Sequence, residues 1–376
     1  MDTPATCIFP SLRRGVVLAA VAALALAGLF ALPAARAGAT TCTKSWAAAV
    51  DGNWSDGSKW TGGTAPTSTD DVCITADSAS YTVTLDVDVS IDSLQLGGSA
   101  NSQTLDLEAH ALDLAADSSL SAQGVLSLGD GSALDLGSHT LHNAGTLQTV
   151  TGPCTATLTN GTLDNTGSLT IGCTTADLFG LLGATNTGTV TIAAGGSWSL
   201  HTLTNSAGTI TNDGALAAGD YTQGNGAVTN NPVDASHTIT LTGTGAAHMR
   251  ATGGGVSLTG SPLTIDQSLD IDTTVLLSND LTNQGTITLG SHILDLRGHT
   301  LHNTGSLQTV TGPCTATLTN GTLDNTGTLT ISCTTSDLFG ALGATNTGTV
   351  TIAAGGSWSL HTLTNSAGTI TNDGAL

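Results

Sequence analysis

The sequence has few basic residues. Lysine and arginine together number seven, against 28 aspartates and glutamates, so the chain of 376 residues carries a formal net charge of −21. Proteins bind nucleic acids and anionic membranes through clustered lysines and arginines that neutralise phosphates. The composition therefore excludes a nucleic-acid partner, and it predicts no membrane insertion by the mature shaft.

Strong helix formers are scarce as well. Glu108 is the only glutamate, and glutamate, lysine and arginine all favour helices. The 48 glycines and the low charged fraction of 9% are compatible with disorder, but the apolar residues are placed periodically. Residues 84–92 alternate strictly between apolar and polar, as a strand with one buried face does. The sequence therefore predicts an ordered all-β protein.

The N-terminus has the pattern of a signal peptide, which we assign to residues 1–37. Arg13 and Arg14 precede an uncharged apolar run over residues 15–32, and Ala35 and Ala37 supply the small residues that a signal peptidase reads. Cleavage is expected after Ala37. An uncleaved membrane anchor is the alternative, because the run approaches the ~20 residues that span a bilayer. Either way, the protein is expected to be secreted or at the cell surface.

A long internal duplication dominates the rest of the chain. Residues 139–216 recur as residues 299–376, with 72 of 78 positions identical. Five of the six differences exchange small or hydroxyl side chains, and only Leu181/Ala341 changes a large volume. A recent duplication explains this identity.

Each copy contains a finer repeat, Asn-x-Gly-x-aliphatic. Its first instances start at Asn143, Asn165 and Asn186, at spacings of 22 and 21 residues. Further instances start at Asn212, Asn283, Asn303, Asn325, Asn346 and Asn372. Asparagine and glycine tolerate positive φ, so each pair predicts a sharp turn before a strand.

A turn-and-strand unit of this length cannot bury its own apolar face, but stacked units build one continuous core. We therefore predict a right-handed parallel β-helix, a solenoid whose shaft covers residues 81–376. A β-sandwich array is the alternative, and it would need turn signals every 8–12 residues.

The cysteines fit the same geometry. Cys7 leaves with the signal peptide, and six cysteines remain in an exported chain, so disulfides are expected. A spacing of 19 residues is close to one coil and places two cysteines one above the other, within disulfide range. The predicted pairs are Cys154–Cys173, Cys314–Cys333 and, by remainder, Cys42–Cys73. Zinc binding is the rejected alternative, because no CxxC spacing is present. No metal or cofactor is expected.

Residues 38–80 differ from the shaft, and we predict that they form a disulfide-closed cap. They contain Trp46, a Gly-Asn-Trp-Ser segment at residues 52–55, Trp60, Pro66 and Asp-Asp-Val at residues 70–72. This order resembles the opening of bacterial secreted β-strand-repeat proteins, including autotransporter-type passengers. The resemblance implies a cap followed by an adhesin-like stalk whose partners are cell-surface or matrix glycans or proteins. Such chains usually continue into a C-terminal anchor, so we expect the sequence to be incomplete at Leu376.

Two sets of residues are candidates for binding or catalysis. Trp54 and Trp60 would form a sugar-stacking platform if they were not part of the cap. Asp266, Asp270 and Asp272 would supply the two carboxylates of a glycosidase, or oxygen ligands for calcium. However, these aspartates alternate with apolar residues as Asp86 and Asp88 do, which favours outward-facing carboxylates that keep the shaft soluble.

Three further patterns have simpler interpretations. The pair His139 and His142, repeated at His299 and His302, would point to opposite faces of a strand and cannot share a metal. Phe179 and Phe339 are expected to serve packing. Thr-x-Thr runs, such as residues 155–159, are similar to the threonine arrays of β-helical ice-binding proteins, but their spacing predicts a drifting register. The expected function is therefore a non-catalytic extracellular stalk, with a glycosidase and an ice-binding protein as the alternatives.

Overall fold

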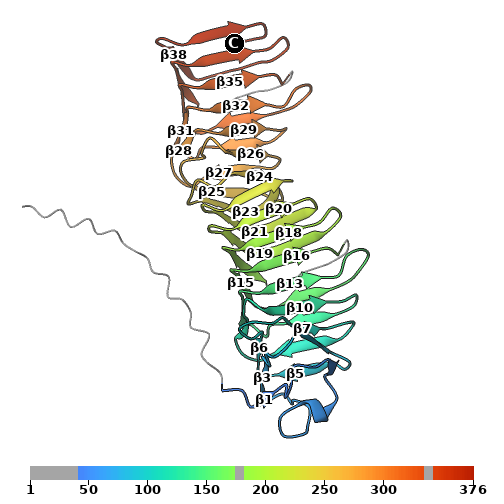
Figure 1. The fold of residues 1–376 in the computed structure, drawn as a ribbon. Helices are drawn as coiled ribbons and strands as arrows, with labels where there is room; N and C mark the ends of the chain where they lie inside the picture. Colours follow the sequence, from blue (N-terminus) through green and yellow to red (C-terminus); the bar gives the residue numbers. More distant parts are fainter. Residues whose placement is uncertain (1–40, 174–181, 334–341) are drawn as a thin grey trace, which may run out of the picture. The chain divides into compact units, whose positions relative to one another are not determined.

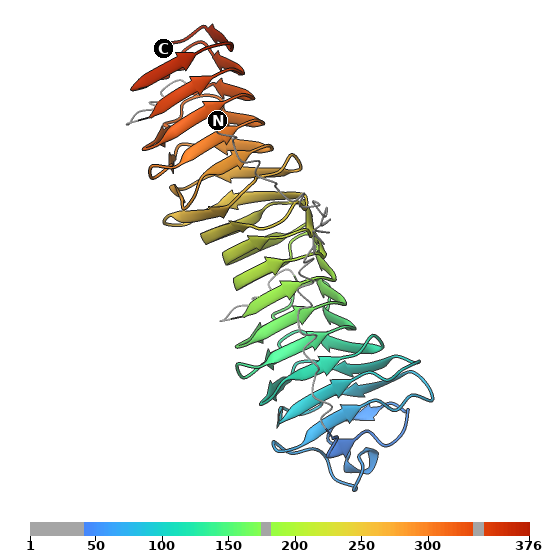
Figure 2. The same ribbon diagram turned by 90° about the vertical axis from the view of Figure 1, so that its left-hand side faces the viewer.

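The computed structural model describes residues 41–173, 182–333 and 342–376. Every strand pairing among them is parallel, apart from one isolated antiparallel bridge between Trp46 and Trp60. The strands stack in about 14 turns (Figures 1 and 2). The predicted parallel β-helix is thus confirmed, while its right-handed sense stays a prediction. The signal-peptide prediction, Phe179 and Phe339 lie outside the described residues.

Strands of successive turns pair to form four parallel sheets. The only helix within the described ranges is the 3-10 turn η1 (Gly57–Lys59). A nine-stranded sheet contains β2 (Gly52–Asn53), β4 (Tyr81–Thr84), β7 (Gln103–Asp106), β10 (Gly124–Leu128), β13 (Thr146–Thr149), β16 (Ser168–Ile171), β18 (Thr189–Ile192), β20 (Thr209–Asn212) and β22 (Ala227–Asn230). A four-stranded sheet contains β5 (Val89–Ile91), β8 (Ala111–Leu114), β11 (Ala133–Asp135) and β14 (Thr157–Thr159). A five-stranded sheet contains β28 (Leu281–Asn283), β31 (Thr300–Asn303), β34 (Thr322–Asn325), β36 (Gly343–Asn346) and β38 (Thr362–Asn365).

The remaining strands form one large sheet. Its first half contains β1 (Lys44–Ser45), β3 (Asp71–Ile74), β6 (Ser93–Leu96), β9 (Ser118–Leu120), β12 (Thr140–Asn143), β15 (Thr162–Asn165), β17 (Gly183–Asn186), β19 (Ser197–Asn205), β21 (Ala215–Gln223) and β23 (Val233–Leu241). Its second half contains β24 (Ala247–Ala251), β25 (Val256–Gly260), β26 (Gln267–Ile271), β27 (Val275–Leu277), β29 (Thr286–Leu289), β30 (Ile293–Asp295), β32 (Ser306–Thr309), β33 (Thr317–Thr319), β35 (Thr328–Ile331), β37 (Thr349–Ile352) and β39 (Thr369–Asn372).

The core is a column of aliphatic side chains that continues from turn to turn. In most strands every second residue is buried, and strand pairing places these buried residues directly above one another. One such column runs through Leu105, Leu126, Leu147, Leu169, Val190, Ile210 and Val228. Each fully buried aliphatic side chain contributes about 1.5–3 kcal/mol. Stacking therefore supplies the core that a single turn lacks.

Asparagines that are buried, except Asn365, form two ladders beside this column. They show that the repeat motif has a different cause from the one predicted. The amide nitrogen of Asn143 donates to Asn165 over 2.7 Å, and that of Asn165 donates to Asn186 over 2.8 Å. The first ladder runs through Asn143, Asn165, Asn186 and Asn205, and the second through Asn283, Asn303, Asn325, Asn346 and Asn365. Among the described asparagines, positive φ occurs only at Asn160, Asn230 and Asn320, none of which begins the motif.

The glycine of the motif is also required for space and not for positive φ. A Cβ atom on Gly167 would collide with the carbonyl oxygen of Gly145 in the turn before it. The predicted bend is present at residues 166–167, but the φ-based reason for it was wrong. The motif therefore combines a buried amide with a close approach between consecutive turns.

The six cysteines form the three predicted pairs, two of them predicted from spacing and the third by remainder. Cys154–Cys173 and Cys314–Cys333 each join neighbouring turns, with 5.2 Å between their Cα atoms. Cys42–Cys73 joins the segment before β1 to β3, with a Cα separation of 5.7 Å. Such bonds indicate an oxidising, extracellular environment. Within the described ranges, no helix has the length and apolarity needed to cross a bilayer.

The tryptophan-rich segment closes the first turn. The ring centroid of Trp60 lies 4.9 Å from that of Trp46 and 4.8 Å from that of Trp54, and its indole N–H donates to the carbonyl oxygen of Trp54 over 2.8 Å. Trp54 is 1% exposed and Trp60 is 2% exposed. Neither ring presents a face to solvent, so the sugar-platform alternative is wrong for both residues.

Many aspartates near the ends of strands form hydrogen bonds between successive turns. Each of these carboxylates accepts a hydrogen bond from a backbone N–H of the next turn, in the pairs Asp51–Thr82, Asp77–Ser99, Asp88–Ala111, Asp117–Thr140, Asp130–Thr155 and Asp280–Thr300. The hydrogen bond from the backbone of Thr300 lowers the pKa of Asp280, and that from Ala111 lowers the pKa of Asp88. Besides adding solubility, these aspartates therefore join one turn to the next.

Candidate functional site

The three aspartates proposed as catalytic lie on and beside one strand. Asp270 faces outward from β26, while Asp266 immediately precedes this strand and Asp272 immediately follows it. Asp266 and Asp272 are exposed, and Asp270 accepts a hydrogen bond from His248 over 2.7 Å. These positions fit the outward-facing carboxylates that the alternating pattern favours.

A charged cluster connects three turns at this point. Strand pairing places Arg250 between Asp234 in the turn before and Asp270 in the turn after. Arg250 donates to both carboxylate oxygens of Asp234, over 2.7 and 2.6 Å. These hydrogen bonds raise the pKa of Arg250, and the negative charges of Asp272 and Asp270 act in the same direction. A bidentate pair of this kind fixes the geometry of both side chains.

His248 makes the cluster sensitive to pH. Its hydrogen bond to Asp270 raises the pKa of His248, against a smaller opposing effect of burial. A group whose folded pKa is raised stabilises the fold fully below its ordinary pKa, about 6.5 for histidine, and this stability is lost as the pH rises through the folded pKa. The contribution of the His248–Asp270 pair to stability is therefore largest in mild acid.

We expect the variant His248→Gln to be destabilised more in mild acid than in mild base. The difference in unfolding free energy from the unmodified chain should be larger near pH ~5.5 than near pH ~8, and it should stay within about 1 kcal/mol because the pair is partly exposed. Thermal denaturation at both pH values measures it. His201→Gln is the control, since the described residues offer His201 no carboxylate partner. An equal effect of His248→Gln at both pH values would contradict the assignment.

The two histidines of the HxxH pattern contact different aspartates. Nδ1 of His139 lies 3.8 Å from Asp117 in the turn before, and Nδ1 of His142 lies 3.2 Å from Asp164 in the turn after. Within the described ranges, no group of three or more histidines, cysteines, aspartates or glutamates is placed to hold a metal ion. The second copy repeats the same two kinds of contact.

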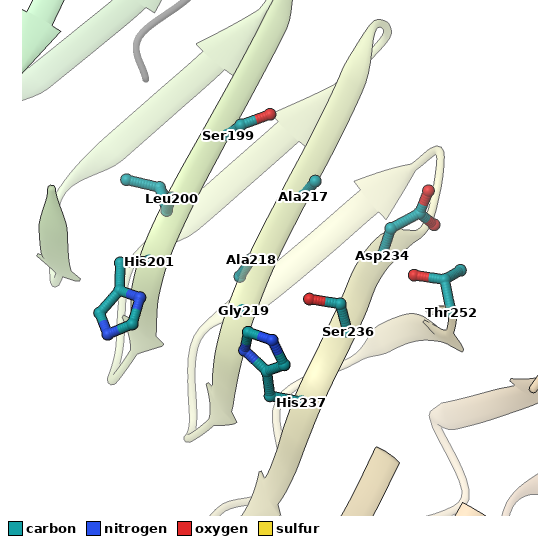
Figure 3. Close-up of a pocket in the computed structure, with 10 residues that line it drawn as sticks. All are labelled: Ser199, Leu200, His201, Ala217, Ala218, Gly219, Asp234, Ser236, His237 and Thr252. Carbon is teal, nitrogen blue, oxygen red and sulfur yellow. The ribbon is translucent and has the colours of Figure 1, made fainter. Parts of the chain in front are cut away.

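An open cleft of about 350 Å³ lies across β19, β21 and β23 (Figure 3). The middle strand supplies only the small residues Ala217, Ala218 and Gly219, so the taller side chains of its neighbours form the walls. His201 and His237 stand on either side of Gly219 (Figure 3). A Cβ atom on Gly219 would lie 2.9 Å from Nδ1 of His237, so this glycine keeps the cleft floor low.

The cleft contains polar groups that are not arranged as a catalytic set. Both carboxylate oxygens of Asp234 are held by Arg250. Among the described residues, neither Ser199 nor Ser236 makes a side-chain hydrogen bond to an imidazole, which an activated nucleophile requires. Asp266, Asp270 and Asp272 do not line the cleft. Sequence reasoning missed the cleft, and a signal for it was the run of small residues at 217–219.

Two threonine-rich patches, which we call the threonine faces, lie on the outside of the stacked strands. The first is formed by the outward residues of β13, β16, β18, β20 and β22, which are Thr146, Gln148, Ser168, Thr170, Thr189, Thr191, Thr209, Thr211, Ala227 and Thr229. The second is formed by those of β29, β32, β35, β37 and β39, which are Thr286, Thr288, Ser306, Gln308, Thr328, Thr330, Thr349, Thr351, Thr369 and Thr371.

The register of these faces corrects the prediction of drift. Thr328 pairs with Thr349 and Thr349 with Thr369, while Thr330, Thr351 and Thr371 stack beside them. The Thr-x-Thr unit therefore repeats in constant register over three successive turns. The run at residues 155–159 takes no part, since its strand, β14, pairs with Ala133 and Asp135.

The threonine faces are uncharged and largely free of internal hydrogen bonds. Neither face contains a charged residue, although the chain carries a net charge of −21. Among the described residues, Thr189, Thr191, Thr209 and Thr211 make no side-chain hydrogen bond, and Thr349 and Thr351 make none either. The columns of the second face continue into Ser268 and the charged Asp270 of β26, which mark its lower edge.

Comparisons with known proteins give no relative. No protein-family model matches the chain, and no curated protein and no solved structure is significantly similar to it.

Proposed function

We propose that the protein is an exported, non-catalytic β-solenoid that acts as an adhesin-like stalk and binds an extended partner through its repeated surface. One observation carries this proposal: four strands of each threonine face lie in the duplicated blocks, and they present equivalent neutral residues in the same register. Two copies of one binding surface increase avidity for a partner with many sites, whereas a second copy adds little to an active site.

The differences between the copies support the same proposal. Two of the six fall on the threonine faces, Thr146/Ser306 and Ser168/Thr328. Both exchanges keep a hydroxyl group, so each face keeps its chemistry. The signal-peptide pattern and the disulfides support export, and the resemblance of the cap segment to bacterial secreted repeat proteins supports an adhesin-like role.

Binding of the purified chain to extended surfaces tests the proposal. The full chain, expressed for export, is incubated with cells, matrix proteins, insoluble polysaccharides and ice, and the bound fraction is measured by sedimentation or partition. We expect binding to one surface that is weakened by lysine at Thr191 and Thr351. Binding to none of these surfaces would contradict the proposal.

The glycosidase remains the alternative proposal. It predicts release of reducing ends from a glycan panel and loss of that release in the variant Asp270→Asn. Asp270 contacts His248 and does not line the cleft, which favours the stalk. Glycan cleavage that Asp270→Asn abolishes would decide for the enzyme.

A further inference from the structure

The chemistry of the threonine faces restricts their partner. With no charged residue on either face, they offer no ion pair to a charged protein, lipid or polysaccharide. The strong net negative charge of the chain also opposes approach to anionic surfaces. The partner of these faces is therefore expected to be neutral.

Sugars fit the threonine faces poorly. Neutral sugars present apolar ring faces on which aromatic side chains stack, and all five tryptophans of this chain, Trp46, Trp54, Trp60, Trp198 and Trp358, are at most 2% exposed. Tyr81 and Tyr221 are buried as well. The faces also lack aspartate, asparagine and arginine, the side chains that hold paired hydroxyls with two hydrogen bonds at once.

The faces instead present a regular grid in which most positions are threonine. Neighbouring strands are separated by about 4.8 Å, and residues two apart along a strand by about 6.6 Å. Each threonine places one hydroxyl, which both donates and accepts, beside one methyl group. Its β-branched side chain has few rotamers, and the buried aliphatic column beneath holds the backbone, so the grid is preorganised.

A partner that matches this grid must be neutral, flat, periodic in two directions and able to donate and accept hydrogen bonds at every lattice point. The surface of crystalline ice has all four properties, and its repeats are of similar size. We propose that the two threonine faces bind ice, with water molecules ordered between the hydroxyl and methyl groups joining the crystal. This proposal rests on the proposed function, since it names the partner of the repeated surface.

Thermal hysteresis and partition into slowly growing ice test the proposal on the full chain. The unmodified protein is expected to produce hysteresis and to enter the ice. Thr351→Lys places charge and bulk within the second face, on β37, and it should remove part of both signals. Combined with Thr191→Lys on the first face, it should remove nearly all of them, because the two faces act together. Thr351→Val, which keeps the shape and one methyl group, should retain more activity than Thr351→Lys.

The duplication provides a matched control. Thr204 on β19 and its copy Thr364 on β38 face outward. In each copy, this strand belongs to a different sheet from the strands of the threonine face. The double variant Thr204→Lys, Thr364→Lys adds the same charge at the same spacing and should leave hysteresis unchanged. Circular dichroism of all variants shows whether they remain folded.

The possible outcomes separate this proposal from the proposed function. No hysteresis and no partition of the unmodified chain would overturn ice binding. The chain can then still bind insoluble cellulose or chitin. If the double variant Thr191→Lys, Thr351→Lys abolishes that binding, the stalk keeps its function with a polysaccharide as partner. Equal loss of ice activity in the face variants and in the control pair would also overturn the assignment to the threonine faces.

Discussion

Replacement of Asn165 by leucine is expected to lower the local stability of its turn by about 4 kcal/mol, because two buried partner groups lose a hydrogen bond at about 1–3 kcal/mol each. Asn165 accepts from Asn143 over 2.7 Å and donates to Asn186 over 2.8 Å. All three side chains are at most 1% exposed, so water cannot replace the lost partner. Leucine has a similar volume, and the effect therefore reports the amide and not a cavity.

Hydrogen–deuterium exchange read by mass spectrometry is the appropriate measurement, since a solenoid opens turn by turn. A loss of about 4 kcal/mol corresponds to about a thousandfold faster exchange through local opening. The equivalent turn around Asn325 is an internal control, because it should keep its protection. Thr162→Leu, at an exposed position of the same strand, should change exchange little. Unchanged protection around Asn165 would show that the ladder does not stabilise the stack.

Replacement of Trp60 by alanine is expected to destabilise the cap by about 3–5 kcal/mol, the usual cost of removing a buried aromatic side chain. Trp60 contacts Trp46 and Trp54, so its loss opens the cover over the first turn. An uncovered strand edge pairs readily with another chain. We therefore expect faster exchange over residues 41–84 and association of the variant, measured by sedimentation velocity.

Trp60→Phe separates packing from hydrogen bonding in this cap. It keeps an aromatic ring but loses the N–H that donates to Trp54, so it should cost only about 1 kcal/mol and leave the association state of the unmodified protein unchanged. A Trp60→Ala variant with the exchange protection and the association state of the unmodified protein would contradict the role of the tryptophans as a cap.

The architecture could be predicted from the sequence because each level of the pattern has one physical cause. Alternating side chains require a buried face, and spacings near 20 residues require stacked turns. The spacing of Cys154 and Cys173 follows from the same turn length. These features depend on local periodicity, which the sequence shows directly.

The asparagine ladders were missed because asparagine has two common roles. It favours positive φ, and its amide also bonds to a copy of itself in the next turn. The recurrence of asparagine at the end of successive strands was the available signal, since a turn accepts several residue types whereas a buried ladder requires one.

The constant register of the threonine faces could not be read from spacing alone. Paired residues are separated by 22 positions from Thr146 to Ser168, 21 from Ser168 to Thr189 and 20 from Thr189 to Thr209. Counted along the sequence, the threonines therefore drift. In the fold, the segments between strands differ in length from turn to turn. Hydrogen bonds between the strands keep the threonine columns aligned.

The offset of 160 residues between the copies has an evolutionary consequence. It corresponds to complete turns, since each outward residue of the first block recurs as an outward residue in the second. Unequal recombination between the two gene segments would therefore produce shorter or longer descendants whose interiors still match. A single genetic event can therefore change the length of the molecule and the number of contacts that it makes at once. The new chain would still fold, because its turns pack as the existing ones do.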